Sequence, residues 1–204
     1  MTKRTPDTAP AAQPASSRPR TARIHPADPR TGRQRLAQAL TLAYAWVLMI
    51  LLGAIVLETF MVYPNVFADP PESLELGMEF LAVTGPSDFF PPLGLATWVL
   101  GAAALVLTWR ERQARWWILA SLVAILGEGL ASIAYFWPRN EIMFVEGLKV
   151  HSAEYLEQVA REFETWHWRS RLGFNALAAV SAFVGFLRFY RHRLLPQDAL
   201  EGNA

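Results

Sequence analysis

Four long apolar stretches limit the folds open to this chain. They lie at about 36–62, 90–109, 116–137 and 168–190. At ~1.5 Å per residue, helices of about 20 residues or more cross a hydrocarbon core of ~30 Å. Backbone groups inside a bilayer must be hydrogen-bonded within the segment, which favours helices. The sequence therefore predicts an all-α, four-helix transmembrane bundle over residues 36–190.

Composition supports one membrane domain. Hydrophobic residues make up 52% of the 204 positions, and there is no cysteine. Disulfides, thiolate metal sites and cysteine catalysis are thereby excluded. The first apolar stretch is too long for the core of a signal peptide, and no small-residue cleavage motif follows it. We therefore expect this stretch to be retained as a membrane span.

The two ends of the chain differ from the apolar middle. Residues 1–35 are rich in Pro, Ala, Ser, Thr and Arg and have no apolar periodicity, which predicts a disordered basic tail. Residues 191–204 form a second short tail. A basic tail beside a membrane span is expected to stay cytoplasmic and to contact anionic lipid. A nucleic-acid partner is not predicted.

Arginine placement predicts the topology. The N-terminal tail, the turn at 110–115 and the cluster at 188–193 are basic, whereas residues 61–90 contain neither Lys nor Arg. Positively charged loops favour the cytoplasmic side. Four spans place both termini there, so we expect a multi-pass protein of the lipid bilayer. The excess of arginine over lysine hints at a bacterial source, and therefore at the inner membrane.

Two segments between the spans have helical periodicity. Leu74, Met78 and Leu81 share one face and predict a short amphipathic helix on the outer side. Residues 139–167 predict an amphipathic helix that leads into the last span. Pro138 is expected to end the third span, because proline interrupts a helix.

Small residues recur along two spans and predict close helix contacts in lipid. The second span carries such a stripe at Gly94, Thr97, Gly101 and Ala104. The last span carries one at Ala178, Ala182 and Gly185.

Polar residues inside the apolar spans are the candidate site. Glu164, His167, Arg171 and Asn175 are spaced i, i+3, i+7 and i+11, which places them on one side of a helix. Glu58 ends the first span and Glu128 lies within the third, with Ser132 on the same face. The depth of these groups places them in the outer half of the membrane, where three spans can bring them together.

The cost of burying charge indicates that these groups face inward. A carboxylate exposed to lipid costs at least ~3 kcal/mol. The guanidinium of Arg171 can hold Glu58 and Glu128 together. Three interpretations stay open: a structural ion-pair network, a site that binds the polar head of an apolar molecule or transfers protons, and a metal site.

The metal interpretation would use Glu58, Glu128, His167 and Glu164. Glu164 and His167 form a Glu-x-x-His pair, which di-iron helical bundles carry twice and this chain carries once. We therefore predict no metal ligands, and the sequence indicates no particular cofactor.

Two short motifs resemble a known family. The sequence AYFWPRN at 134–140 closes the third span, and WHWRSR at 166–171 opens the fourth. Together with the four-span layout over about residues 38–190, they are similar to the anthrone oxygenase-like family of small bacterial membrane proteins, most of them of unknown function. The resemblance implies an oxygenase-like site for a hydrophobic polycyclic substrate, with Trp166, His167, Arg171 and Asn140 as family-pattern positions.

Two functional hypotheses follow. In the first, a hydrophobic aromatic or quinone-like molecule binds in the outer half of the bundle. The catalytic candidates are His167, Arg171 and Glu128, and the substrate-binding candidates are Glu58, Asn175, Trp166 and Asn140. In the second, the chain is a non-enzymatic membrane subunit, or a protein that binds lipid or a partner, and its Glu/Arg network is structural. The sequence leaves open whether the protein is an enzyme.

Overall fold

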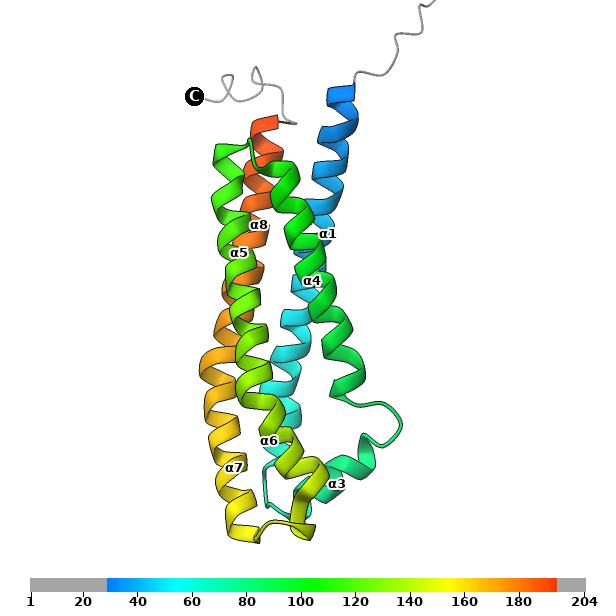
Figure 1. The fold of residues 1–204 in the computed structure, drawn as a ribbon, viewed down its shortest axis with the longest axis vertical. Coiled ribbons are helices and arrows are strands. Elements are labelled where there is room, and N and C mark those ends of the chain that lie inside the picture. Colours follow the sequence, from blue (N-terminus) through cyan, green and yellow to red (C-terminus); the bar gives the residue numbers. More distant parts are fainter. Residues whose placement is uncertain (1–28, 194–204) are drawn as a thin grey trace, which may run out of the picture.

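The computed structural model describes residues 29–193, which are helical throughout this range apart from short connections. Four helical columns run up and down along the long axis (Figure 1). The predicted all-α bundle is confirmed. The predicted disordered tail falls mostly on residues 1–28 and the second tail mostly on 194–204, outside the described residues.

Each column except the second contains a π-helical segment. The first column consists of α1 (Pro29–Leu57), the π-helix η1 (Glu58–Val62) and α2 (Tyr63–Val66). The second column is α4 (Pro86–Thr108). The third consists of α5 (Arg112–Ala131), the π-helix η2 (Ser132–Phe136), α6 (Trp137–Glu141), the π-helix η3 (Ile142–Glu146) and the 3-10 helix η4 (Gly147–Lys149). The fourth consists of α7 (Ala153–Trp166), the π-helix η5 (His167–Leu172) and α8 (Gly173–Arg193). The separate helix α3 (Glu72–Phe80) lies between the first two columns in the chain.

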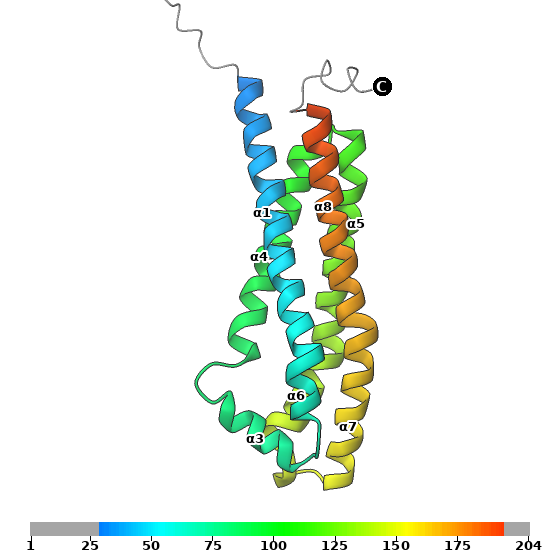
Figure 2. The same cartoon turned by 180° about the vertical axis from the view of Figure 1, so that it is seen from behind.

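The columns form a closed ring. Helix α1 packs against α4 and α8, and α5 packs against the same two helices, so the order around the bundle is α1, α4, α5, α8. Figure 2 shows the same arrangement from behind, with the described ends of α1 and α8 at one end of the molecule. Within the described residues, four helical stretches are long and apolar enough to cross a membrane, as in a multi-pass membrane protein.

The observed helices are longer than the predicted ones. The first begins at Pro29, not at residue 36, and α4 begins at Pro86, not at residue 90. Proline fits a first helical turn because its missing N–H would lack a partner there anyway. The carboxylate of Asp88 also accepts the N–H of Gly85 at 2.9 Å, which stabilises the start of α4.

The third column continues past Pro138, so the prediction that this residue ends it was wrong. The preceding turn is π-helical, and the N–H of Trp137 bonds the carbonyl of Ser132, five residues earlier. Proline normally breaks a helix because its ring meets the carbonyl four residues back. The wider π turn relieves that contact. The predicted helix over 139–167 is correspondingly divided between the end of the third column and α7.

Column length divides the molecule into two parts. Helix α4 has 23 residues and is about 35 Å long, close to the thickness of a bilayer. The third and fourth helical stretches span 38 and 40 residues, or about 57 and 60 Å. They therefore extend beyond the start of α4. In Figure 1 this extension, with α3 beside it, forms the lower end of the molecule.

Each part has its own hydrophobic core. The bundle core comprises Tyr44, Ala45, Leu48, Leu51, Ala104, Ile118, Leu122, Ala124, Ile125, Ala178, Ala179 and Ala182. The core of the extension comprises Tyr63, Val66, Leu74, Phe136, Met143, Leu156, Val159, Ala160 and Phe163. The predicted short outer helix is α3, whose Leu74 is buried in this second core.

The small-residue stripes have different fates along their length. In α4, Thr97, Gly101 and Ala104 are buried, whereas Gly94 has open space around its Cα. In α8, Ala178 and Ala182 are fully buried. A Cβ at Gly185 would lie 2.6 Å from the Cδ1 of Ile118, so α8 and α5 approach closely at this glycine.

One buried hydrogen-bond chain joins three columns. The hydroxyl of Ser121 donates to the carbonyl of Ala178 at 2.7 Å. Its single proton is thereby used, so it accepts from the hydroxyl of Tyr44 at 2.8 Å. Both side chains are fully buried, and the chain satisfies them without water.

We predict that Gly185→Leu destabilises the bundle by about 1–3 kcal/mol, because the new side chain overlaps Ile118. Thermal unfolding of the purified protein in detergent measures the change. Gly53→Leu is the matched control, because Gly53 is exposed and a Cβ there meets nothing within 4 Å. Equal unfolding temperatures for the two variants would contradict the packing of α8 on α5.

Candidate functional site

Three charged side chains from three columns meet in the interior, as the cost of burying them predicted. Glu58 comes from η1, Glu128 from α5 and Arg171 from η5. The Nε of Arg171 donates to Oε1 of Glu128 at 3.0 Å. Its Nη1 lies 3.9 Å from Oε2 of Glu58, which is an electrostatic contact rather than a hydrogen bond. The three side chains are at most about one-tenth exposed.

Glu128 is the principal partner of Arg171. Its Oε1 accepts a second hydrogen bond from the hydroxyl of Ser132, at 2.7 Å and one turn further along the chain. Two donors on one oxygen hold the carboxylate in a single orientation. Glu128 is therefore committed to holding Arg171 in place.

Aromatic rings surround the charged head of Arg171. Its guanidinium carbon lies 5.2 Å from the ring centre of Phe90 and 5.6 Å from that of Phe136. Cations are attracted to the faces of such rings. The planar group is thus held by one carboxylate and two rings, and the Tyr63 side chain lies close to both Arg171 and Glu58.

His167 is fully buried behind this cluster. Its Nδ1 lies 3.2 Å from the hydroxyl of Thr59, and that hydroxyl donates its proton to the carbonyl of Ile55 at 2.6 Å. The hydroxyl must therefore accept from Nδ1–H. This places a proton on Nδ1 and leaves Nε2 as the atom that faces Glu58.

Glu58 and His167 form an incompletely paired couple. Oε2 of Glu58 and Nε2 of His167 are 3.8 Å apart, and both atoms are buried without a hydrogen-bond partner among the described residues. With a neutral imidazole, two carboxylates and one guanidinium leave one surplus negative charge. A proton on either member of the couple would neutralise the cluster. The couple is therefore the part of the cluster whose facing atoms are left incompletely paired.

The π-helical segments coincide with the cluster. Glu58 and Thr59 lie in η1, Ser132 begins η2, and His167 and Arg171 lie in η5. A π turn inserts one extra residue, so it changes which side chains share a face. His167 and Arg171, four residues apart within η5, both face Glu58.

A large cavity opens next to the charged cluster, on the side toward α3 and α6. Its volume is about 880 Å³, and it lies between η1, α3, the first turns of α4, and the η2–α6 segment. The walls are mostly apolar and include Phe90, Trp98, Phe136 and Phe144. The polar side chains on its surface are those of Glu58, Tyr63, Ser87, Glu128, Ser132, Asn140, Glu141 and Arg171.

The predicted site residues divide into three groups. Glu58, Glu128, Arg171 and Asn140 line the cavity. His167 lies behind Glu58 and does not reach the cavity surface. Two others do not line the cavity at all.

Asn175 and Trp166 are the predicted residues that do not line it. Asn175 is buried one turn further along the chain than Arg171, and its Nδ2 donates to the carbonyl of Arg171 at 2.8 Å. Trp166 is half exposed and packs edge-on against Tyr135, with ring centres 6.0 Å apart. Neither is in place to contact a ligand in the cavity.

The sequence did not single out four residues of the site, namely Thr59, Tyr63, Phe90 and Phe136. Tyr63 stacks edge-on against His167 at 4.6 Å. Phe90 and Phe136 read as ordinary membrane-facing or core residues. The only available signal was the spacing of Thr59 beside Glu58, because adjacent polar residues at a span end are costly unless both are buried together.

The described residues contain no group of three or more His, Asp or Glu side chains that could hold a metal ion. Glu164 and His167 lie on opposite sides of the junction between α7 and η5, and Glu128 is bonded to Arg171. The metal interpretation therefore has no support in the geometry.

The fold and the site together define a four-column helical bundle of membrane type with a charged cluster at the base of an apolar cavity. Comparison with family models, with characterised proteins and with solved structures gave no match to this chain. The resemblance to the anthrone oxygenase-like family therefore stays a prediction, and the function is argued from the site.

The two carboxylates should respond differently to neutralisation. Glu128→Gln removes the charge that holds Arg171, and we expect a loss of stability of about 1.5–3 kcal/mol. Glu58→Gln removes the surplus negative charge, so we expect stability to be unchanged or higher. Thermal unfolding in detergent measures both, with Glu157→Gln at an exposed position as the control. The reverse order of stabilities would contradict this charge balance.

Proposed function

We propose that this protein binds a hydrophobic aromatic or quinone-like molecule in the cavity and holds one of its oxygen atoms with Arg171. One observation carries the proposal: a buried guanidinium, held by Glu128, lies at the base of an apolar cavity of about 880 Å³. Small-molecule sites commonly have volumes of about 300–1,000 Å³, apolar walls and a few placed polar groups.

The walls favour a flat aromatic ligand. Phe90 and Phe136 flank the guanidinium, and Trp98 lines the same cavity. Aromatic rings stack on such side chains. A carbonyl or phenolic oxygen would accept a hydrogen bond from Arg171, whereas a purely apolar molecule would not. The chemistry therefore favours a polycyclic quinone, phenol or anthrone over a hydrocarbon.

Proton transfer is the reaction that the site supports best. Glu58 lines the cavity, and His167 lies behind it at 3.8 Å. Glu58 would exchange a proton with the ligand, His167 would take up or return that proton, and Arg171 would stabilise an oxyanion. Of the proton carriers first considered, Glu128 is committed to Arg171 and His167 acts through Glu58. An anthrone oxygenase-like activity would begin with such a proton removal.

The location follows from the same argument. Both described ends lie at one end of the bundle, and the cavity lies toward the other. The basic clusters favour the cytoplasm for the first end. We therefore place the cavity at the outer boundary of a bacterial inner membrane, where an apolar ligand enters from lipid.

A cavity-filling variant tests the proposal. Gly94 lines the cavity, and a Cβ there meets nothing within 4 Å. We expect Gly94→Phe to fold normally and to weaken binding of anthrone or anthraquinone by at least about tenfold. Quenching of the tryptophan fluorescence of Trp98 and Trp137, which line the cavity, measures binding. Gly53→Phe, on an exposed face of α1, is the matched control.

The role of Arg171 is tested separately. Arg171→Lys keeps the charge but loses the planar fork, so we expect at least about tenfold weaker binding of a quinone. Arg169→Lys, at an exposed position two residues earlier, should change nothing. Unchanged quinone binding in Arg171→Lys and in Gly94→Phe would overturn the proposal. Mass spectrometry of material extracted from the purified protein would identify the natural ligand.

A structural role is the second candidate, favoured by the fact that Arg171, Glu58 and Glu128 join three columns. In that case the chain is a membrane subunit or a lipid-binding or partner-binding protein. Arg171→Ala would then abolish folded protein in detergent, because removing one partner of a buried ion pair costs about 3–5 kcal/mol. An intact wild-type protein that binds no aromatic ligand would favour this role.

A further inference from the structure

A second hollow lies at the opposite end of the bundle, where α1 and α8 have their described ends. Its volume is about 340 Å³. It is lined by residues of α1, of the end of α4, of the α4–α5 turn and of α8, namely Arg33, Gln34, Ala37, Leu107, Arg110, Glu111 and Phe189. This hollow is separate from the cavity above Arg171 and shares no lining residue with it.

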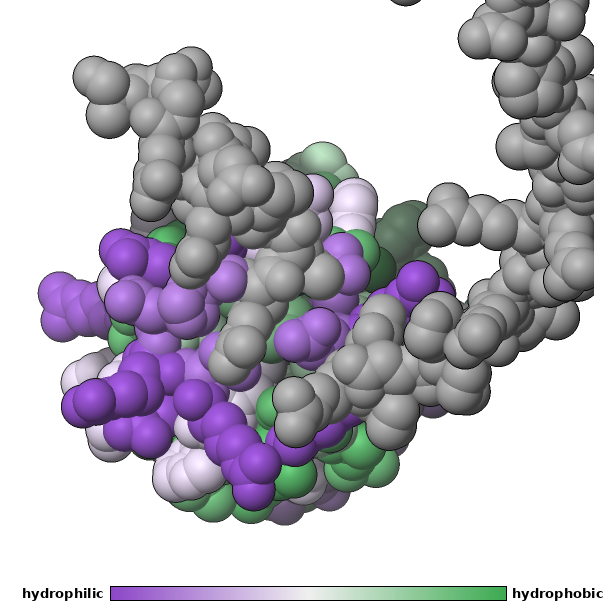
Figure 3. All heavy atoms as spheres, turned by 90° about the horizontal axis from the view of Figure 1, so that it is seen from above, coloured by the Kyte–Doolittle hydropathy of each residue, from purple (hydrophilic) through white to green (hydrophobic). Residues whose placement is uncertain are grey.

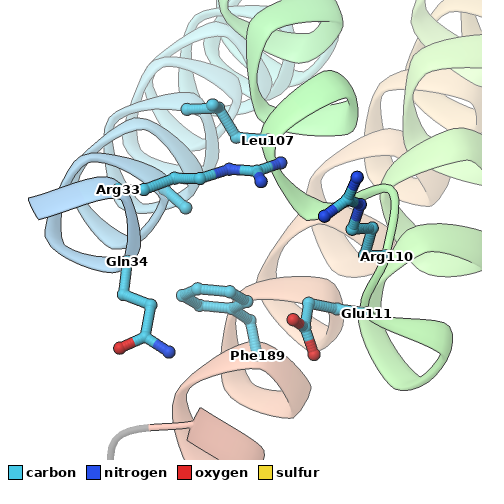
Figure 4. A pocket seen from close by; sticks show the side chains of 7 residues that line it. Arg33, Gln34, Leu107, Arg110, Glu111 and Phe189 are labelled. Carbon is cyan, nitrogen blue, oxygen red and sulfur yellow. The ribbon is translucent and has the colours of Figure 1, made fainter. Parts of the chain in front are cut away.

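Two arginines face each other across this hollow. In Figure 4, Arg33 and Arg110 direct their guanidinium groups toward one another. Neither side chain has an ion pair or hydrogen bond among the described residues. Both side chains are exposed, and an anion between them would be attracted by both positive charges. Guanidinium groups bind phosphate oxygens in pairs of parallel hydrogen bonds.

The remaining walls limit what the anion can be. The carboxylate of Glu111 points toward the ring of Phe189 in Figure 4, and Glu111 has an interaction of its own. Ala37 and Phe189 are each 2% exposed and form an apolar base with Leu107. The hollow therefore combines two cationic side chains with an apolar base, at the edge of an apolar span.

The surrounding surface favours a lipid over a free ion. Hydrophilic side chains gather over this end of the bundle (Figure 3). Arg112, Arg188 and Arg191 are exposed there as well. Beside the hollow, Leu36 and Val106 are 53% and 69% exposed on the sides of α1 and α4, in place to contact acyl chains. Basic residues next to a membrane span are attracted to anionic headgroups.

We infer that Arg33 and Arg110 form a binding site for the phosphate group of an anionic phospholipid. The phosphate lies between the two guanidinium groups, and an acyl chain lies against Leu36 and Val106 on the sides of α1 and α4. The site is independent of any ligand in the cavity above Arg171. It joins α1 to the α4–α5 turn through the lipid, at the end where the described part of α1 begins.

The test uses the full chain purified in mild detergent and native mass spectrometry with phosphatidylglycerol. We expect one phosphatidylglycerol to stay bound to the wild type. The double variant Arg33→Gln/Arg110→Gln should bind it at least about tenfold more weakly. The double variant Arg112→Gln/Arg191→Gln is the matched control, because it removes the same charge at exposed positions outside the hollow.

Four outcomes decide the inference. Selective loss in the Arg33/Arg110 variant, with retention in the control, supports it. Equal loss in both double variants overturns it, because attraction would then come from the net charge of the surface. Equal retention of phosphatidylcholine and phosphatidylglycerol also overturns it. Binding of inorganic phosphate alone, with no retained lipid, would assign the site to a free anion and overturn the lipid assignment.

Discussion

The buried pair of Arg171 and Glu128 is the interaction on which the cavity-containing part of this protein depends. It joins η5 to α5 at 3.0 Å in a place where neither charge could remain alone. Ser132 fixes the carboxylate, and Phe90 and Phe136 hold the guanidinium. Between this level and the described ends of α1 and α8, the bundle is closed by small residues and aliphatic packing. At this level the helices are held by charge, and they separate enough to leave a cavity.

The same pair explains why the two buried carboxylates differ in how well they are paired. Glu128 forms the close ion pair with Arg171, so the nearest charged or titratable partners of Glu58 are Arg171 at 3.9 Å and the imidazole of His167 at 3.8 Å. The facing oxygen of Glu58 and nitrogen of His167 are both buried without a hydrogen-bond partner among the described residues. Two residues of the same type thus have different roles, set by which of them reaches the guanidinium.

Much of this arrangement could be predicted from the sequence. Apolar length gave the four helices, and the cost of buried charge indicated that Glu58, Glu128 and Arg171 meet. The details could not be predicted, because they depend on backbone register. His167 lies behind Glu58, and Asn175 is buried one turn further along the chain from Arg171, outside the cavity. Pro138 continues a helix only because η2 precedes it, and Trp166 packs outward on Tyr135.

The short α4 has a consequence for how such proteins could diversify. The third and fourth columns continue past its first residue, Pro86, so the bundle loses one wall there and α3 covers the gap only in part. The size of the cavity therefore depends on a difference in helix length rather than on the sizes of individual side chains. Each helical turn added at the start of α4 would shorten the cavity by one turn, while the charged cluster at its base would stay unchanged. Insertions or deletions near Gly85 would then change which molecules fit the cavity, without changing the residues of the charged cluster.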